Sequence, residues 1–335
     1  MNSDAAGQEN THTKTKSRYL YGRFKNPYPG YKSRGLLDLL KWGIVDSILG
    51  KKPKKPKSYD FEVIENDGSI LRNNKDKFTV TWVGHSTLLI QIDGFNILTD
   101  PVWSNRASPV GFMGPKRHVK PGINLKDLPD IDFVIISHDH YDHLDKQTIK
   151  KLGNKPYYLV PLGTGRFFRN LHINRYEELD WHDSVKINGI EFICTPSQHF
   201  SGRRPFIVYD TLWCSWVIKG RENSFYFAGD GGYFPGFKEI GEFYGPFDLA
   251  LLPIGSYKPQ WFMGSVHMSP SEAVQAFTDL KGKNFVPIHW GTFELSDEPL
   301  DDPPAVLRKE IQERSLPEEK FWILKHGETK IVNSR

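Results

Sequence analysis

The sequence predicts an α/β (α+β) protein in which two β-sheets are covered by helices. Strand-like runs come in clusters with helical segments between them, which is the pattern of packed sheets rather than of strictly alternating strands and helices. The 335 residues can bury a large core, and the composition is that of an ordinary globular protein with 13% aromatic residues. Two cysteines, Cys194 and Cys214, are too few for a disulfide framework, so nothing indicates a secreted disulfide-rich protein.

The sequence contains no segment typical of a membrane span. No apolar run approaches the ~20 residues that a spanning helix needs, and the polar N-terminus lacks the apolar region of a signal peptide. We therefore expect a cytoplasmic protein, either free or peripheral on the inner face of a membrane.

The net charge of +4 is unevenly distributed. Residues 1–58 contain 13 Lys/Arg against 4 Asp/Glu, a net +9, whereas residues 59–335 carry a net −5. A basic segment of this kind suits an anionic surface, either phospholipid or nucleic acid. We divide the chain accordingly into a basic N-terminal region, 1–58, and a main domain, 59–335.

The N-terminal region is expected to contain three parts. Residues 1–17 read as a disordered polar tail, and 18–31, rich in aromatic, Pro and Gly residues, as an irregular strap on the core. In 35–50, apolar residues recur near one helical face, and a lysine-rich run, 51–57, follows. This helix is either an interfacial membrane anchor or a helix docked on the core before a solvated linker, and the sequence does not separate the two.

In the main domain, the first strand-like sequence follows Phe78. Runs rich in β-branched and aromatic residues predict strands at 79–85, 86–92, 95–99, 133–137, 157–161, 190–195, 213–219, 224–228, 249–254, 284–288 and 321–324. Helical composition predicts helices at 145–152, 165–171, 269–280 and 305–314. The third of these helices starts at Ser269-Pro270-Ser271-Glu272, a helix-opening signal.

The densest group of metal-binding residue types follows the apolar run 133–136. It reads His138-x-His140-x-Asp142-His143. Three imidazoles and a carboxylate within six positions suit a borderline cation such as zinc. The spacing suggests two metals, because the first two histidines lie on an extended segment and the last two residues on the turn that opens a helix. A polar loop capping a helix is the plain alternative, but ligands this dense rarely serve packing.

Three further candidates follow the same order, an apolar strand and then His or Asp. They are His199 after 190–195, Asp230 after 224–228 and His289 after 284–288. Glycines beside Asp230 let the backbone approach a metal closely. A lone histidine after a strand is more often structural, but all three would line one rim of a sheet.

The order of these ligands resembles the metallo-β-lactamase superfamily. A closer resemblance, to the N-acylphosphatidylethanolamine-hydrolysing phospholipases D, is carried by the motifs TWVGHST at 81–87, LTDP at 98–101, SNRASP at 104–109, MGPKR at 113–117, TPSQH at 195–199, GPFDLA at 245–250, WFM at 261–263 and IHWGTF at 288–293. The resemblance runs from about residue 23 to residue 328. It departs at 200–205 and in the loop up to 213, a region expected to border the mouth of the site.

The resemblance implies an αββα four-layer sandwich with two Zn²⁺ per chain. By this resemblance, His138, His140 and His199 would bind one zinc. Asp142, His143 and His289 would bind the other, and Asp230 would bridge the two zinc ions. The catalytic residues implied are Asp142, Asp230 and His267, the last at the cavity mouth. His85 and Asp100 are either groups that orient ligands or buried polar residues satisfied within the sandwich.

The resemblance implies a zinc-dependent phosphodiesterase that converts N-acylphosphatidylethanolamine to N-acylethanolamine and phosphatidate. Two zinc ions would lower the pKa of a shared water from 15.7 towards about 7. The sequence has no Gly-x-Ser-x-Gly nucleophile motif. The alternative is a dizinc hydrolase of the same fold acting on a lactone, a cyclic nucleotide or another phosphodiester. The implied partners are a phospholipid substrate, a membrane surface contacted by the basic N-terminal segment, and a second copy in a homodimer; no nucleic acid is expected.

Overall fold

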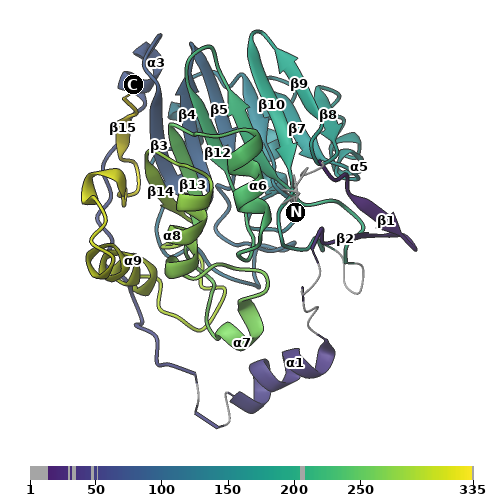
Figure 1. Ribbon diagram of the computed structural model, residues 1–335, viewed down its shortest axis with the longest axis vertical. Helices are drawn as coiled ribbons and strands as arrows, with labels where there is room; N and C mark the ends of the chain where they lie inside the picture. Colours follow the sequence, from purple (N-terminus) through teal and green to yellow (C-terminus); the bar gives the residue numbers. More distant parts are fainter. Residues whose placement is uncertain are drawn as a thin grey trace, which may run out of the picture.

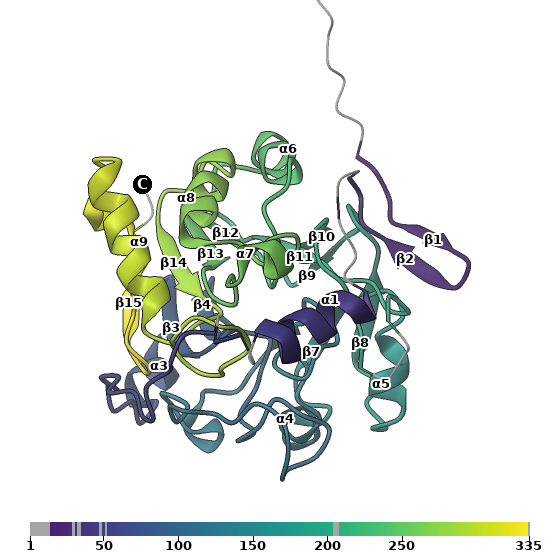
Figure 2. The same ribbon diagram turned by 90° about the horizontal axis from the view of Figure 1, so that it is seen from below.

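Two β-sheets pack face to face and helices cover both outer faces, as seen from below in Figure 2. The computed structural model describes residues 14–28, 31, 35–46, 49–50, 52–203 and 208–333. Figure 1 shows the strands of both sheets aligned roughly along the vertical axis, with α1 (Leu36–Leu40) and α7 (Gln260–Met263) at the lower end of the molecule.

The first sheet has seven strands in the order β15-β3-β4-β5-β6-β7-β8. Their bounds are β3 Thr79–Gly84, β4 Thr87–Ile92, β5 Phe95–Thr99, β6 Phe133–Ile135, β7 Tyr157–Pro161, β8 Tyr176–Leu179 and β15 Thr329–Ile331. Strands β5 to β8 are parallel, and β3 runs the same way because two antiparallel pairings separate it from β5.

The second sheet has six strands in the order β14-β13-β12-β11-β10-β9. Their bounds are β9 Ser184–Ile187, β10 Ile190–Thr195, β11 Ser215–Lys219, β12 Ser224–Phe227, β13 Leu249–Pro253 and β14 Phe285–Ile288. Strands β10, β12, β13 and β14 share one direction. Their carboxyl ends therefore meet at one edge of the sheet.

Side-chain alternation along the strands builds the layers. In β4, Leu88 and Ile90 join the large core between the sheets, whereas Leu89 joins the smaller core under the helices. The helices on the first sheet are α3 (Ser69–Asn73), α4 (Lys146–Leu152) and α5 (Gly165–Arg169). Those on the second sheet are α6 (Gly236–Phe243), α8 (Pro270–Asp279) and α9 (Asp302–Glu313). The expected αββα four-layer sandwich is confirmed.

Most predicted elements are present, with ends shifted by a few residues. Ser269 caps α8 in a capping box with Glu272, and Asp145 caps α4 through Gln147 N. The predicted closing strand 321–324 is wrong: Phe321, Trp322 and Leu324 are buried, but only Phe321 forms a bridge, to Phe285, and the closing strand is β15. The sequence also did not predict β8, β9, α3 or α6.

The N-terminal region is more ordered than predicted where it is described. Residues 18–25 form a hairpin of β1 (Arg18–Leu20) and β2 (Arg23–Lys25) instead of an irregular strap. Of the tail predicted to be disordered, 1–13 lie outside the described residues, while Lys16 contacts Asp183. Helix α1 continues as a π-helical turn, Lys41–Val45, which docks on α7 through Trp42.

Gly229 shows how tightly the two sheets meet beside the predicted ligands. It adopts a left-handed backbone conformation (φ +61°), and a methyl group there would overlap the side chain of Ser137, in the segment that leads to His138. Gly189, in contrast, has a φ of +92°, and a methyl group there would meet no neighbouring atom within 4 Å.

Gly229→Ala should therefore destabilise the protein more than Gly189→Ala. Both changes incur the left-handed strain of about 1–2 kcal/mol, and only the first adds a clash, so we expect a further ~1–3 kcal/mol in urea unfolding. Equal losses for the two variants would contradict this close packing.

Candidate metal centre

The rims of both sheets place the candidate ligands around one point. His138 and His140 follow β6 in the first sheet, and Asp142 and His143 lie on the turn before α4. From the second sheet, β10, β12 and β14 end shortly before His199, Asp230 and His289, respectively. Because these strands share a direction within each sheet, their carboxyl ends converge on the seam between the sheets.

The first group of donors consists of three histidines. The Nδ1 atom of His140 lies 2.8 Å from His138 Nε2 and 3.3 Å from His199 Nε2. The three donor atoms all lie within 4.8 Å of one another. This is the set that the family resemblance assigned to one metal position.

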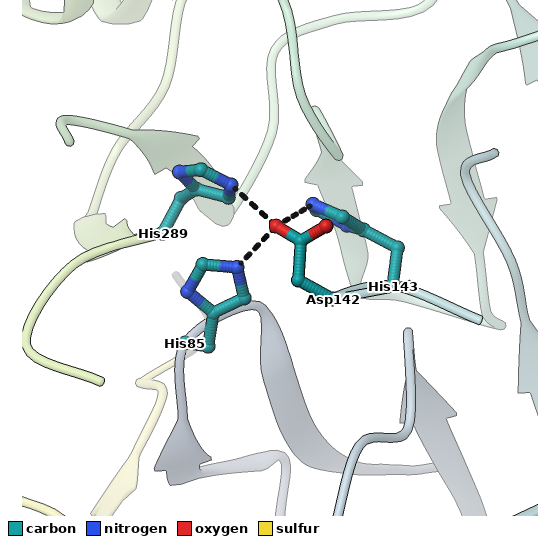
Figure 3. Close-up of side chains that lie close together, drawn as sticks. All are labelled: His85, Asp142, His143 and His289. Atoms are coloured by element: carbon teal, nitrogen blue, oxygen red, sulfur yellow. Dashed lines mark hydrogen bonds and ion pairs between the residues drawn. The ribbon is translucent and has the colours of Figure 1, made fainter. Parts of the chain in front are cut away.

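The second group gathers around one carboxylate oxygen, as Figure 3 shows. Asp142 Oδ2 lies 3.3 Å from His289 Nε2 and 3.4 Å from His143 Nε2. These are the residues assigned to the other position. A fourth side chain, His85, joins them, with its Nε2 2.9 Å from the same oxygen.

Asp230 lies between the two groups. Its Oδ2 is 3.7 Å from His199 Nε2, 3.3 Å from His143 Nε2 and 3.0 Å from His289 Nε2. The structure thus brings all seven predicted ligands together, with Asp230 between the two donor groups, where a residue that bridges two metals is expected. That these seven residues bind metal remains a prediction.

A buried hydrogen-bond network behind the ligands orients them. Asp100 Oδ2 accepts from His143 Nδ1 at 2.6 Å and from Ser137 Oγ at 2.5 Å, and Asp100 Oδ1 accepts from Ser137 N at 2.7 Å. His199 Nδ1 lies 2.9 Å from the Val266 carbonyl. Of the two readings open for Asp100, the geometry therefore favours the one that orients a ligand, leaving Nε2 of His143 to face the centre.

The segment after His199 is hydrogen-bonded to the loop that carries His138 to His143. Arg203 Nη1 donates to the carbonyls of Asp139 (2.8 Å) and Leu144 (2.7 Å), and Tyr141 Oη donates back to the Arg203 carbonyl at 2.6 Å. No local sequence pattern indicates these contacts. They join residues about 60 positions apart.

The pKa values of the predicted ligand histidines shift in opposite directions in the two groups, because burial dominates in the first and neighbouring carboxylates dominate in the second. Burial lowers the pKa of His138, His140 and His199, which favours neutral imidazoles able to coordinate a metal. Burial would also lower the pKa of His289, but Asp230 and Asp142 outweigh it and raise that pKa to about 9.

The same balance holds His143 and the two carboxyls ionised. Burial disfavours the charge on His143, yet Asp142 and Asp100 raise its pKa well above the usual value. Burial would raise the pKa of Asp142 and Asp230, but the surrounding histidines, chiefly His143 and His289, respectively, lower it well below the usual value. Buried carboxylates in this setting require positive charge nearby.

The donor atoms that face the centre fit a metal ion. His143 Nε2 and Asp230 Oδ1 are buried and have no hydrogen-bond partner among the described residues. Four zinc ligands at ~2.0–2.2 Å in a tetrahedron lie about 3.4 Å apart, close to the 3.3–3.4 Å spacing of Asp142 with His143 and His289. Nitrogen and carboxylate donors in this number suit zinc or another first-row cation.

His267 stands over the centre. Its Nδ1 lies 3.6 Å from Asp230 Oδ1, and its ring centroid is 5.3 Å from that of His199 and 5.5 Å from that of His289. The side chain is 13% exposed, about as much as that of Asp142 (12%), whereas the side chains of His199 and His289 are fully enclosed. This position is consistent with the cavity mouth predicted for it.

The geometry defines a class of protein, a two-sheet sandwich with a paired His/Asp metal centre on its rim. The family model of the β-lactamase superfamily domain matches residues 95–290. The chain belongs to this superfamily and is a metal-dependent hydrolase with the metallo-β-lactamase fold.

Relatives in sequence and structure agree with this assignment. An uncharacterised protein of Mycobacterium tuberculosis is 41% identical over 85% of this chain and 77% of its own length. N-acyl-phosphatidylethanolamine-hydrolyzing phospholipase D 1 of Caenorhabditis elegans is 44% identical over 64% of each chain. A yeast mitochondrial enzyme of the same name is 34% identical over 73% of this chain and 53% of its own. In fold, the metallo hydrolase Igni18 of Ignicoccus hospitalis aligns with a TM-score of 0.59 at 22% identity, covering 77% of this chain and all of that one.

The pKa shifts predict how pH acts on the metal-free protein. His143 and His289 have raised pKa values, so their contribution to stability is complete below about pH 6.5 and is lost as the pH rises towards 9. The other buried ligand histidines have lowered pKa values, so stability falls below pH 6.5, where the unfolded chain binds protons that the folded chain does not. The melting temperature of metal-stripped protein should therefore peak near pH 6.5.

Restoring the metal should remove the decline above pH 6.5, because the metal replaces the protons on these histidines. Thermal unfolding of stripped and zinc-restored protein across pH 5–9.5 measures both effects. A stripped protein whose melting temperature rises between pH 6.5 and 9 would contradict the charge balance described for the second group.

Proposed function

We propose that the protein is a zinc-dependent phosphodiesterase that hydrolyses N-acylphosphatidylethanolamine to N-acylethanolamine and phosphatidate. The observation that carries the proposal is the pair of donor groups joined at Asp230, which suits two cations held close together. Support for the substrate comes from the two relatives named as phospholipases of this specificity. Two zinc ions held there would polarise a phosphoryl oxygen and activate a water at neutral pH.

The chain's own residues would position the reactants. Asp230 lies between the donor groups, and its buried Oδ1 has no hydrogen-bond partner in the part of the chain that the structure describes. His267, at the mouth and 3.6 Å from that oxygen, is placed to hold a proton near the leaving alkoxide. Ser137 Oγ lies 2.9 Å from His138 Nδ1, but it is fully buried and donates to Asp100 Oδ2. The sequence also has no Gly-x-Ser-x-Gly motif, which favours water as the attacking group.

Removal of one donor should abolish turnover. Asp142→Asn and His289→Ala should each reduce hydrolysis of N-acylphosphatidylethanolamine by roughly 10³-fold or more, because each disrupts the second position. His182→Ala is the matched control, since His182 is partly buried but contacts Tyr244 and Phe243 instead of a predicted ligand.

The assay should identify products by mass spectrometry and metal by elemental analysis of the protein as purified. We expect N-acylethanolamine and phosphatidate, with about two zinc ions per chain. Turnover of a generic phosphodiester or a lactone, without release of N-acylethanolamine, would favour the alternative substrate classes instead. Active protein without a transition metal would overturn the mechanism.

We also propose that the first helical segment contacts the phospholipid surface. Leu37, Leu40 and Ile44 are 81%, 41% and 52% exposed and lie at helical spacing on one side. Trp42 faces the other way, stacks on Phe262 at 5.0 Å and donates to Asp297. The helix is thus docked on the core and still presents apolar side chains outward, so features of both earlier interpretations are present.

Basic residues and the position of the segment favour an anionic lipid surface. The ammonium of Lys41 lies over Trp261, and that of Lys52 over Trp42. Trp261 itself is 37% exposed on α7, beside α1 at the lower end of the molecule in Figure 1. Apolar side chains ringed by cations are typical of interfacial helices. Among the described residues, no helix is long and apolar enough to cross a bilayer.

Charge placed on this face should weaken membrane binding. Leu37→Asp combined with Ile44→Asp should reduce partitioning onto vesicles with anionic phospholipid by roughly tenfold or more, through lost burial and added repulsion. Cleavage of a soluble diester should stay unchanged. Ile70→Asp, on α3 at the other end of the molecule, is a matched control because Ile70 is 78% exposed. Equal partitioning of the double variant and the control would refute the proposed contact.

A further inference from the structure

His85 is a buried histidine that the seven predicted ligands do not include. It follows β3, where the first sheet reaches the rim, and is only 1% exposed. Its Nε2 lies 2.9 Å from Asp142 Oδ2, shorter than the distance from that oxygen to His143 or His289. Figure 3 shows its ring directed at the shared oxygen.

The backbone of His85 is held in an unfavourable conformation. Its φ is +56°, and that of His289 is +60°, both in the left-handed region that non-glycine residues rarely occupy. The His85 carbonyl accepts hydrogen bonds from Trp82 Nε1 (2.9 Å) and from the backbone N–H of His289 (3.1 Å). The second bond joins the end of β3 in one sheet to the end of β14 in the other. Strain kept in place by specific contacts of this kind gathers at functional sites.

The hydrogen-bond pattern assigns the proton on the His85 ring. Its Nδ1 is buried and has no hydrogen-bond partner among the described residues. A proton on Nδ1 would leave a buried N–H unsatisfied and would set a bare Nε2 against a carboxylate oxygen. A proton on Nε2 avoids both penalties and makes His85 the donor to Asp142.

The ring itself has little freedom to move. It packs against His289 with centroids 4.1 Å apart and meets the edge of Phe293 at 5.3 Å and 84°. A donor fixed by packing on both sides can fix the carboxylate that it contacts. His85 therefore touches two of the three predicted ligands of the second position, Asp142 through a hydrogen bond and His289 through its ring and backbone.

We propose that His85 is a positioning residue of the second metal position, which holds the Asp142 carboxylate and the His289 ring in place by direct contact. It plays for Asp142 the part that Asp100 plays for His143, with donor and acceptor exchanged. The proposal rests on the metal centre of the proposed function and is independent of which substrate is cleaved.

Zinc titration of the full-length protein, stripped and then reloaded in competition with a chromophoric chelator, tests the proposal. His85→Ala should weaken zinc binding at one position by about 10–100-fold and leave the other within about threefold. His85→Gln keeps an N–H donor of similar reach at the same strained backbone and should recover most of that loss.

His326→Ala is the matched control for packing. His326 is also 1% exposed and lies against the same Trp82, at 4.2 Å between centroids, but it contacts no predicted ligand. It should lower the melting temperature of the metal-free protein without weakening zinc binding. The same pattern for His85→Ala, a lower melting temperature with unchanged zinc binding at both positions, would show a purely structural role and overturn the proposal.

Two further measurements sharpen the result. In an Asp142→Asn background, His85→Ala should change zinc binding by less than about threefold, because its partner is already altered; an undiminished effect there would refute positioning through Asp142. In the cobalt-substituted protein, the d–d absorption of His85→Ala should keep the wild-type pattern. Loss of a nitrogen ligand from that spectrum would make His85 itself a ligand and overturn the proposal. Because no lipid enters these measurements, an inactive but zinc-binding protein would count against the proposed substrate alone.

Discussion

The structure depends on negative charge buried at the seam between two sheets. Asp100 and Asp230 are 0% and 3% exposed, and the side chain of Asp142 is 12% exposed. Carboxylates in such a place destabilise a fold unless cations and hydrogen bonds surround them. Here histidines from both sheets do so, and the raised pKa values of His143 and His289 record how strongly the site attracts positive charge. A fold that buries carboxylates among histidines in this way is suited to bind metal ions.

The strand order of the sandwich brings the histidines and carboxylates together. Each sheet directs several strands of one orientation to the same rim, so short extensions of the strands place a side chain at the seam. The interior alternation that buries Leu88 and Ile90 also fixes the register of β4 and, through pairing, the heights at which β3 and β5 end. His85 and Asp100 stand at those two ends. The packing of the core thus decides which polar residues can reach the ligands.

Local sequence patterns predicted part of this well. The run from His138 to His143 carries its own chemistry, and most long apolar strands are recognisable because their residues are buried on both faces. The resemblance to a known family supplied the assignment of His199, Asp230 and His289 to two positions. The polar edge strands β8 and β9 have too few apolar residues to be distinguished from loops. Residues 321–324 have the apolar composition of a strand, but only Phe321 forms a bridge, to Phe285 in β14, and Phe321 and Trp322 are buried by packing on the core.

What the sequence could not predict is the set of contacts between distant loops, and these bear directly on the support of the predicted ligands. The segment after His199 departs from the pattern of the family that it resembles, yet Gly202 N donates to Asp139 Oδ1 at 2.9 Å and Arg203 binds two carbonyls of the metal-binding loop. The guanidinium of Arg203 also lies over the rings of Tyr141 and Phe167. Because this segment holds the loop that carries His138 to His143, it cannot change its shape without changing the support of those predicted ligands. Variation in this segment is therefore constrained by the contacts that it makes with the loop.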